Sequence, residues 1–204
     1  SEHRGLSEQD LLRNHLIKRF RQIKIITTWG GKGEKKIYGM NYLYAIRHPE
    51  RPGVRLVGAV DPFVKTCDAC PVYPTADELF AHCRPDLTVV ATPIHFHPEQ
   101  AVTVFEHGSH VLLEKPMAAT MEGAGDILRA RDRAGRMLGV GFQLCADKAV
   151  RALKRDVDAG LYGAPVSLKV IVLWPRDYAY YHRSCGWAGK RHDAEGRPIF
   201  DNVL

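Results

Sequence analysis

The sequence predicts an α/β protein built on a doubly wound parallel sheet. Short apolar runs alternate with helical patterns between residues 23 and 142, and this alternation is typical of a parallel sheet with helices on both faces. A glycine-rich loop follows the first run, an Asp–Pro pair follows the second, and Glu–Lys–Pro follows the fourth. Ligands bind beyond the carboxyl ends of parallel strands, so residue types suited to binding lie where such a sheet needs them.

Five apolar runs, each bounded by turn residues, are the expected strands of this sheet. They are IKIIT (23–27), VRLVGAV (54–60), LTVVA (87–91), HVLL (110–113) and MLGVGF (137–142). A longer run, VSLKVIVLW (166–174), is expected to form a strand that opens a second structural unit.

The segments between these runs carry helical signals. Thr75 and Glu78 have the spacing of a capping box at a helix start. Gly108, Gly135 and Gly160 lie where helices are expected to end. The expected helices cover residues 7–22, 37–48, 75–82, 98–107, 120–135 and 147–159.

These elements divide the chain into three parts. Residues 1–22 form a helical extension before the first strand, and residues 23–142 form one doubly wound domain of ordinary size. Residues 143–204 are expected to begin a second domain, and they are too few to complete one of comparable size.

Composition favours a cytoplasmic protein that binds neither membranes nor nucleic acid. No apolar run approaches the ~20 residues needed to cross a bilayer, and the opening segment lacks the apolar stretch of a signal peptide. The formal net charge is +6. We attribute this charge to a solvated basic helix near the start, because no nucleic-acid motif accompanies it.

The cysteines are expected to be reduced thiols, because the chain has 5 of them and no secretory signal. Cys67 and Cys70 form one C-x-x-C pair, and a structural zinc site needs a second pair of ligands with similar spacing. His95 and His97 could supply such a pair, but alternate positions directly after a strand are better explained as part of a ligand-binding turn. We therefore expect no metal site.

The loop after the first strand is expected to bind the pyrophosphate of a dinucleotide. Gly30 and Gly33 match the second and third glycines of a G-x-G-x-x-G loop, and Gly31 lies between them. Thr28 takes the first place, where a β-branched residue resists the tight turn. The run EKK (34–36) resembles an insertion before the helix. By itself, this loop is equally compatible with an ordinary surface loop.

Asp61, at the end of the second strand, is the expected partner of the adenosine ribose. A carboxylate there accepts hydrogen bonds from the ribose hydroxyls and repels a 2′-phosphate, which favours NAD over NADP. The alternative is a turn aspartate before Pro62.

Lys115, after the fourth strand, is the candidate catalytic residue. A lysine at a strand end that faces a cofactor can donate to a substrate oxygen and stabilise the alkoxide that develops as hydride leaves. Gln143 follows the fifth strand and is expected at the same cofactor edge. Without further context, the tripeptide Glu–Lys–Pro is more often a turn.

Residues 85–120, PDLTVVATPIHFHPEQAVTVFEHGSHVLLEKPMAAT, resemble the Gfo/Idh/MocA family, the relatives of glucose–fructose oxidoreductase and inositol dehydrogenase. They follow that family's pattern of strand, TP-x-x-x-H, helix, G-x-H-V, strand and EKP. The segments GAVDP (58–62) and YPTADEL (73–79) match the preceding section. The resemblance covers residues 54–175 well and residues 23–53 poorly.

The resemblance implies a Rossmann domain followed by an α/β domain with an open, mostly antiparallel sheet. It implies NAD(P)-dependent hydride transfer from a sugar or polyol hydroxyl, and a full-length protein that forms homo-oligomers. By position, Thr92, Pro93 and His97 would line the nicotinamide side of the cofactor site. Lys115 would be the catalytic lysine, and Glu114 and Pro116 would shape the turn that presents it.

The sequence departs from the family at three places. The glycine loop has Thr28 and extra residues, and Cys145 stands where the family commonly has arginine. The family's catalytic Asp and His would lie beyond Leu204, so the chain is expected to be incomplete and inactive by itself. Two alternatives stay open: an NAD-dependent glycoside hydrolase of the same fold, and a dinucleotide-binding fragment without catalysis.

Overall fold

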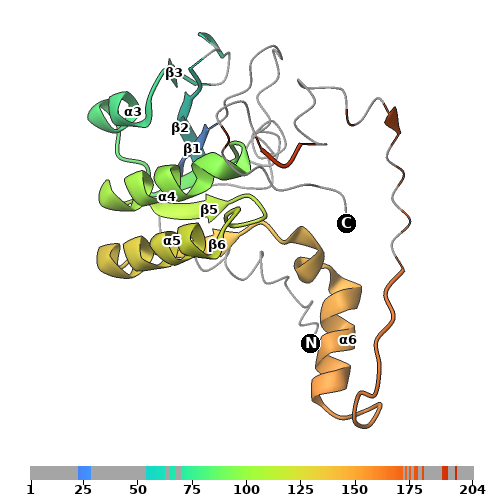
Figure 1. The fold of residues 1–204 in the computed structure, drawn as a ribbon. Helices are drawn as coiled ribbons and strands as arrows, with labels where there is room; N and C mark the ends of the chain where they lie inside the picture. Colours follow the sequence, from blue (N-terminus) through green and yellow to red (C-terminus); the bar gives the residue numbers. More distant parts are fainter. Residues whose placement is uncertain are drawn as a thin grey trace.

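A parallel sheet with helices over one face forms the main body of the described residues (Figure 1). The computed structural model describes residues 23–28 and 54–171, apart from 63, 64, 68 and 69, and isolated positions between 173 and 196. Within this part of the chain, the sheet has 6 strands in the order β3-β2-β1-β4-β5-β6. The strands are β1 (Ile23–Thr28), β2 (Val54–Val60), β3 (Val72–Tyr73), β4 (Leu87–Val90), β5 (His110–Leu113) and β6 (Leu138–Val140).

Every neighbouring pair in this sheet is parallel. From β1 the chain adds β2 and β3 on one side of the sheet, and then β4, β5 and β6 on the other side. This is the arrangement of a doubly wound Rossmann sheet. The predicted fold class is therefore confirmed. The sequence analysis missed only β3, whose two residues, Val72 and Tyr73, pair with Ala59 and Val60.

Three helices lie side by side over one face of the sheet (Figure 1). They are α3 (Ala76–His82), α4 (His97–Glu106) and α5 (Met121–Ala134). The predicted helix starts at residues 75 and 120 are confirmed, because the Oγ1 atoms of Thr75 and Thr120 accept hydrogen bonds from the first turns of α3 and α5. Gly135 ends α5 in the left-handed conformation at φ 60°, where glycine carries no steric cost.

The core fills the space between the sheet and these helices. β4 is buried along its whole length, as expected of a strand in the middle of a parallel sheet. The largest completely buried side chains include Phe105 on α4, Leu79 on α3 and Ile127 on α5. Each helix therefore contributes its apolar face to one common core.

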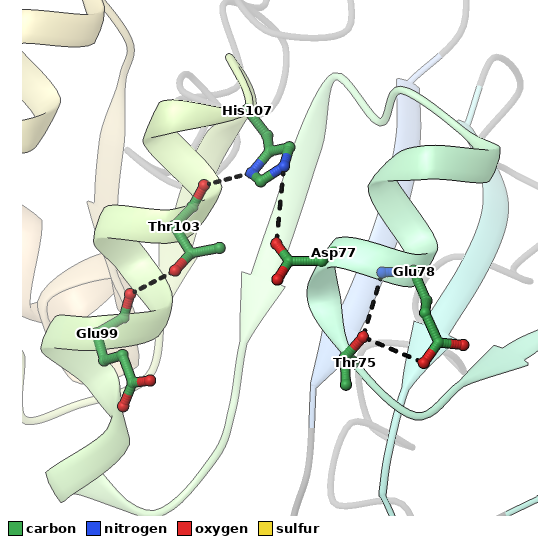
Figure 2. Close-up of polar contacts among 6 residues, drawn as sticks. All are labelled: Thr75, Asp77, Glu78, Glu99, Thr103 and His107. Carbon is green, nitrogen blue, oxygen red and sulfur yellow. Dashed lines mark hydrogen bonds and ion pairs between the residues drawn. The ribbon is translucent and has the colours of Figure 1, made fainter.

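Polar contacts connect α3 and α4 at their exposed surfaces (Figure 2). His107 Nδ1 donates to the Thr103 carbonyl over 2.9 Å, and its Nε2 lies 3.8 Å from Asp77 Oδ1. The His107 ring also stacks on Phe80, with the ring centroids 4.2 Å apart. Because exposed ion pairs contribute little to stability, the apolar packing beneath them is the stronger connection.

The predicted strand at 166–174 is wrong over its described residues, since residues 166–171 form no strand. Val166 is 98% exposed and Leu168 is 84% exposed. The run has a strand-like pattern, but a strand also needs a neighbour for its backbone hydrogen bonds and a surface for its apolar face. The described part of the chain provides neither at this position.

The helix α6 (Lys148–Asp158) stands away from the sheet (Figure 1). Asp147 caps its start, as expected, because its Oδ1 accepts from the N–H groups of Ala149 and Val150. None of its residues is buried. The helices expected at 7–22 and 37–48 lie outside the described residues, and the division of the chain at residues 22 and 142 stays a prediction.

Gly123 allows α5 to pack closely on the start of α4. A methyl group at Gly123 would lie 2.8 Å from Pro98 Cγ, closer than carbon atoms approach. Gly123→Ala is therefore expected to lower the free energy of unfolding by about 1–3 kcal/mol, as overpacked cores do. Urea unfolding of the purified chain measures this change.

Gly125 on the same helix supplies the matched control. A methyl group there would lie 3.0 Å from Arg129 Nη1, at the end of a flexible side chain that can move aside. Gly125→Ala is expected to raise the free energy of unfolding by roughly 0.5–1 kcal/mol through helix propensity. Equal effects of the two substitutions would contradict the assigned helix contact.

Candidate functional site

The carboxyl ends of the strands are flush along one edge of the sheet. Thr28, the last residue of β1, aligns with Val60 of β2 and with Val90 of β4. Val90 aligns with Leu113 of β5, which aligns with Val140 of β6. The residues that follow these strands therefore lie in one row, as expected of a ligand-binding edge.

Asp61 lies in this row directly after β2. Its side chain is buried, with 3% of the residue exposed, and its N–H donates to the Tyr73 carbonyl over 3.0 Å. This bond continues the pairing of β2 with β3 by one residue and fixes the backbone that presents the carboxylate. Gly30, Gly31 and Gly33, the expected pyrophosphate loop, lie outside the described residues.

Thr92 and Pro93 follow β4 and lead into the short 3-10 helix η1 (Ile94–Phe96). Thr92 is buried, and its hydroxyl donates to Gln100 Oε1 over 2.7 Å. Because the Thr92 hydroxyl hydrogen is donated to Gln100, Thr92 Oγ1 can interact with a ligand only as a hydrogen-bond acceptor. Gln100 was not among the predicted residues, although it lies in the first turn of α4, which directly follows this loop.

Glu114, Lys115 and Pro116 follow β5. The Glu114 N–H donates to the Val90 carbonyl over 2.9 Å, which extends the pairing of β5 with β4 past its last residue. Glu114 Oε2 accepts from the Lys115 N–H over 3.1 Å, and the Lys115–Pro116 peptide bond is cis. Lys115 itself is exposed, so its ammonium group is free to meet a ligand at this edge.

His97, at the start of α4, lies beneath these two turns and is completely buried. Its Nε2 is 2.9 Å from the Thr92 carbonyl oxygen, and its Nδ1 is 3.0 Å from the Pro116 carbonyl oxygen. Burial lowers the pKa of His97 from its ordinary value, against the opposing effects of these carbonyl groups and of the Glu114 carboxylate. The ring thus contacts both the turn after β4 and the turn after β5.

The lowered pKa of His97 predicts a pH-dependent stability. In the unfolded chain the ring takes up a proton near pH ~6.5, and in the folded chain it does so only at lower pH. Between these two pKa values the unfolded chain binds more protons. The free energy of unfolding therefore falls as the pH drops below ~6.5, by at most about 1.4 kcal/mol per pH unit from this group.

Urea unfolding between pH 7.5 and pH 5 measures this effect as the difference between the natural chain and His97→Gln. The difference between the two slopes isolates His97 from the exposed histidines, which both proteins share. Parallel slopes for the two proteins would show that the His97 pKa is not lowered by folding.

Gln143 begins the short 3-10 helix η2 (Gln143–Ala146), which follows β6. Its backbone therefore lies beyond the same edge of the sheet as Asp61 and Lys115. Its role at the cofactor edge stays a prediction.

Two cavities lined by described residues lie at the opposite, amino-terminal edge of the sheet. The smaller one, of about 220 Å³, adjoins Pro85, Gly108 and His110, and the larger adjoins Arg55 and Cys83. Neither is lined by Asp61, Thr92 or Lys115. We therefore locate the site by the strand ends and not by these cavities.

Two further features concern only the part of the chain that the structure describes. No three His, Cys, Asp or Glu side chains gather closely enough to hold a metal ion. None of the helices combines the length and the apolar character needed to span a bilayer.

A family model matches residues 36–142, which form just over half of the chain. It describes an oxidoreductase family with an NAD-binding Rossmann fold. The chain belongs to the Gfo/Idh/MocA family. The matched residues contain the turns at Asp61, Thr92 and Lys115, whereas β1, the strand between β2 and β4 on the same edge, precedes them.

Curated relatives in the Gfo/Idh/MocA family extend well beyond this chain. A 1,5-anhydro-D-fructose reductase from Ensifer adhaerens is 32% identical over 130 residues, which are 62% of this chain and 37% of that protein. An inositol 2-dehydrogenase from Mycolicibacterium smegmatis is 31% identical over 137 residues, which are 61% of this chain and 40% of that protein. The chain therefore matches less than half of either relative.

A solved structure supports the same assignment. The WlbA dehydrogenase from Bordetella pertussis, in complex with NADH and UDP-GlcNAcA, superposes with a TM-score of 0.72 at 27% identity. The match covers 83% of this chain and 49% of that one. It therefore extends beyond the residues that the family model covers.

Proposed function

We propose that this chain is the cofactor-binding part of an NAD-dependent oxidoreductase that acts on a sugar or polyol hydroxyl by hydride transfer. One observation carries the proposal: a single flush strand edge has a buried carboxylate, Asp61, towards one end and an exposed lysine, Lys115, towards the other. The names of the two curated relatives, a reductase and a dehydrogenase, support it.

The dimensions of the edge fit a dinucleotide. Asp61 follows β2 and Lys115 follows β5, which is three strands away in the sheet. At the usual strand spacing, this separation is roughly 14–15 Å. An extended dinucleotide can therefore place its adenosine ribose at Asp61 and its nicotinamide near Lys115, which is the orientation that this type of sheet favours.

Each residue of the row has an assigned task. Asp61 accepts hydrogen bonds from the ribose hydroxyls, and the glycines 30, 31 and 33 make room for the pyrophosphate. Thr92 and Pro93, with the turn at Glu114, border the nicotinamide, and Gln143 extends this border beyond β6. The nicotinamide ring, when bound, supplies the hydride acceptor for the substrate carbon.

Lys115 acts on the substrate oxygen. As hydride leaves the carbinol carbon, negative charge develops on the hydroxyl oxygen, and an ammonium group within hydrogen-bond distance stabilises it. The exposed position of Lys115, directly after β5, allows its side chain to reach over the edge. From composition we place the protein in the cytoplasm, and from the resemblance to the family we propose that the full-length form is a homo-oligomer.

Asp61 is expected to make the protein prefer NAD to NADP. A buried carboxylate repels the 2′-phosphate of NADP, and Asp61→Asn removes this charge with little change in shape. We expect the substitution to shift the ratio of the two dissociation constants towards NADP by about tenfold, which corresponds to about 1.4 kcal/mol. Fluorescence titration with NADH and NADPH measures both constants.

Asp126→Asn is the matched control, because Asp126 lies on α5, exposed and paired with Arg129. It is expected to leave both dissociation constants unchanged. NADPH binding by the natural chain that equals or exceeds NADH binding would refute the assignment of Asp61 to the ribose. A natural chain that binds neither cofactor would refute the proposed function itself.

A further inference from the structure

One turn of α4 contacts both of the loops that form the nicotinamide end of the proposed site. Gln100 accepts a hydrogen bond from the Thr92 hydroxyl, and His97 Nε2 lies at hydrogen-bond distance from the Thr92 carbonyl. His97 Nδ1 lies at hydrogen-bond distance from the Pro116 carbonyl. The same buried ring therefore touches the residue before Pro93 and the residue after Lys115.

This arrangement adds a second connection between the two loops. The first is the Glu114 N–H bond to the Val90 carbonyl, which belongs to the sheet and holds only the beginning of each loop. His97 contacts the loops further out, beyond the ends of the strands. The two connections together leave little freedom for Pro93 and Lys115 to move relative to each other.

We propose that His97 is a positioning residue, which holds the Thr92–Pro93 turn and the Glu114–Lys115–Pro116 turn in the relative placement that binds the nicotinamide. The inference rests on the proposed function, because it assigns a cofactor to this edge. It gives His97 a task other than contact with a ligand, in agreement with its complete burial. Gln100 supports the same turn by fixing the Thr92 side chain.

Three substitutions separate the two contacts of the ring. His97→Asn keeps an amide donor near the place of Nδ1, which faces the Pro116 carbonyl. His97→Gln keeps one near the place of Nε2, which faces the Thr92 carbonyl. His97→Leu removes both contacts and retains an apolar side chain of comparable size.

The dissociation constant of NADH is measured by fluorescence for each variant, at a temperature where all of the chain is folded. We expect His97→Leu to raise it at least tenfold, with smaller increases for His97→Asn and His97→Gln. The control is His107→Asn, at the far end of α4, where the ring contacts Thr103 and Phe80. It is expected to leave NADH binding unchanged.

Amide hydrogen exchange without cofactor supplies a readout that does not depend on ligand binding. Loss of the His97 contacts is expected to speed exchange at Glu114 and Lys115 at least tenfold while the Val111 amide, inside β5, keeps its rate. A purely structural role would instead speed exchange throughout the sheet. If His97→Leu does not fold, the two amide variants carry both measurements.

Each outcome decides a different question. A natural chain that binds NADH, with variants that bind it equally well, would overturn the inference and leave the proposed function in place. A natural chain that does not bind NADH would overturn the proposed function. In that case, unchanged exchange at Glu114 and Lys115 would overturn the positioning role as well, and locally faster exchange would support it.

Discussion

Lys115→Met in the complete polypeptide is expected to lower kcat by about 10²–10⁴-fold, the usual range for a group that stabilises charge or transfers a proton in the transition state. The affinity for NADH is expected to change little, because the lysine is assigned to the substrate oxygen. Steady-state rates with inositol and related polyols measure the first quantity, and fluorescence titration measures the second.

Two further substitutions test the chemical role of Lys115. Lys115→Arg keeps the positive charge and is expected to retain more activity than Lys115→Met. Lys154→Met is the matched control, because Lys154 lies exposed on α6 and pairs with Asp158. A Lys115→Met protein within threefold of the natural rate would exclude Lys115 from the chemistry.

The 204-residue chain by itself is expected to bind NADH without turning substrate over. Hydride transfer needs a substrate held over the nicotinamide and a group that takes up the hydroxyl proton. The chain matches only 37% and 40% of the length of the two curated relatives. The described row supplies residues for cofactor binding and the charge of Lys115, and none of the described residues has been assigned the role of taking up the hydroxyl proton.

NADH production against a panel of sugars and polyols tests this expectation, with a longer natural form of the protein as the reference. The isolated chain is also expected to self-associate, because Val166, Leu168 and Leu173 are between 84% and 98% exposed. Comparable turnover by the two forms would show that the 204 residues are sufficient for catalysis. Release of a hydrolysis product without net NADH would instead favour the glycosidase alternative.

The sequence predicted the elements whose signals are local. Thr75 and Thr120 precede their helices with the spacing of N-caps, and Gly135 follows α5, where the chain turns through a positive φ. The runs at 54–60 and 110–113 are rich enough in apolar residues to predict the strands β2 and β5. These signals depend on neighbours along the chain, so they can be read without knowledge of the fold.

The remaining features depend on contacts between distant residues. β3 has only two residues and is defined by its pairing with Ala59 and Val60. No pattern in the neighbouring sequence predicts this pairing. The run at 166–174 shows the opposite case, because strand propensity without a pairing partner does not make a strand. Gln100 belongs to the site because it accepts a hydrogen bond from Thr92, 8 residues earlier in the chain. The sequence did not predict this role, because a polar residue in a helix usually indicates only exposure to solvent.

The flush carboxyl edge has a practical consequence for engineering. All of the assigned residues that the structure describes lie at one end of the strands, so the turns at the other end can be altered at a distance from the proposed cofactor site. The turn at Gly135 is suited to this purpose, because it is exposed and no atom lies within 4 Å of the place where a side chain would stand, while Gly135 itself is retained for its positive φ of 60°. A short peptide tag or a fluorescent label introduced beside Gly135 would report on the protein from outside the proposed site.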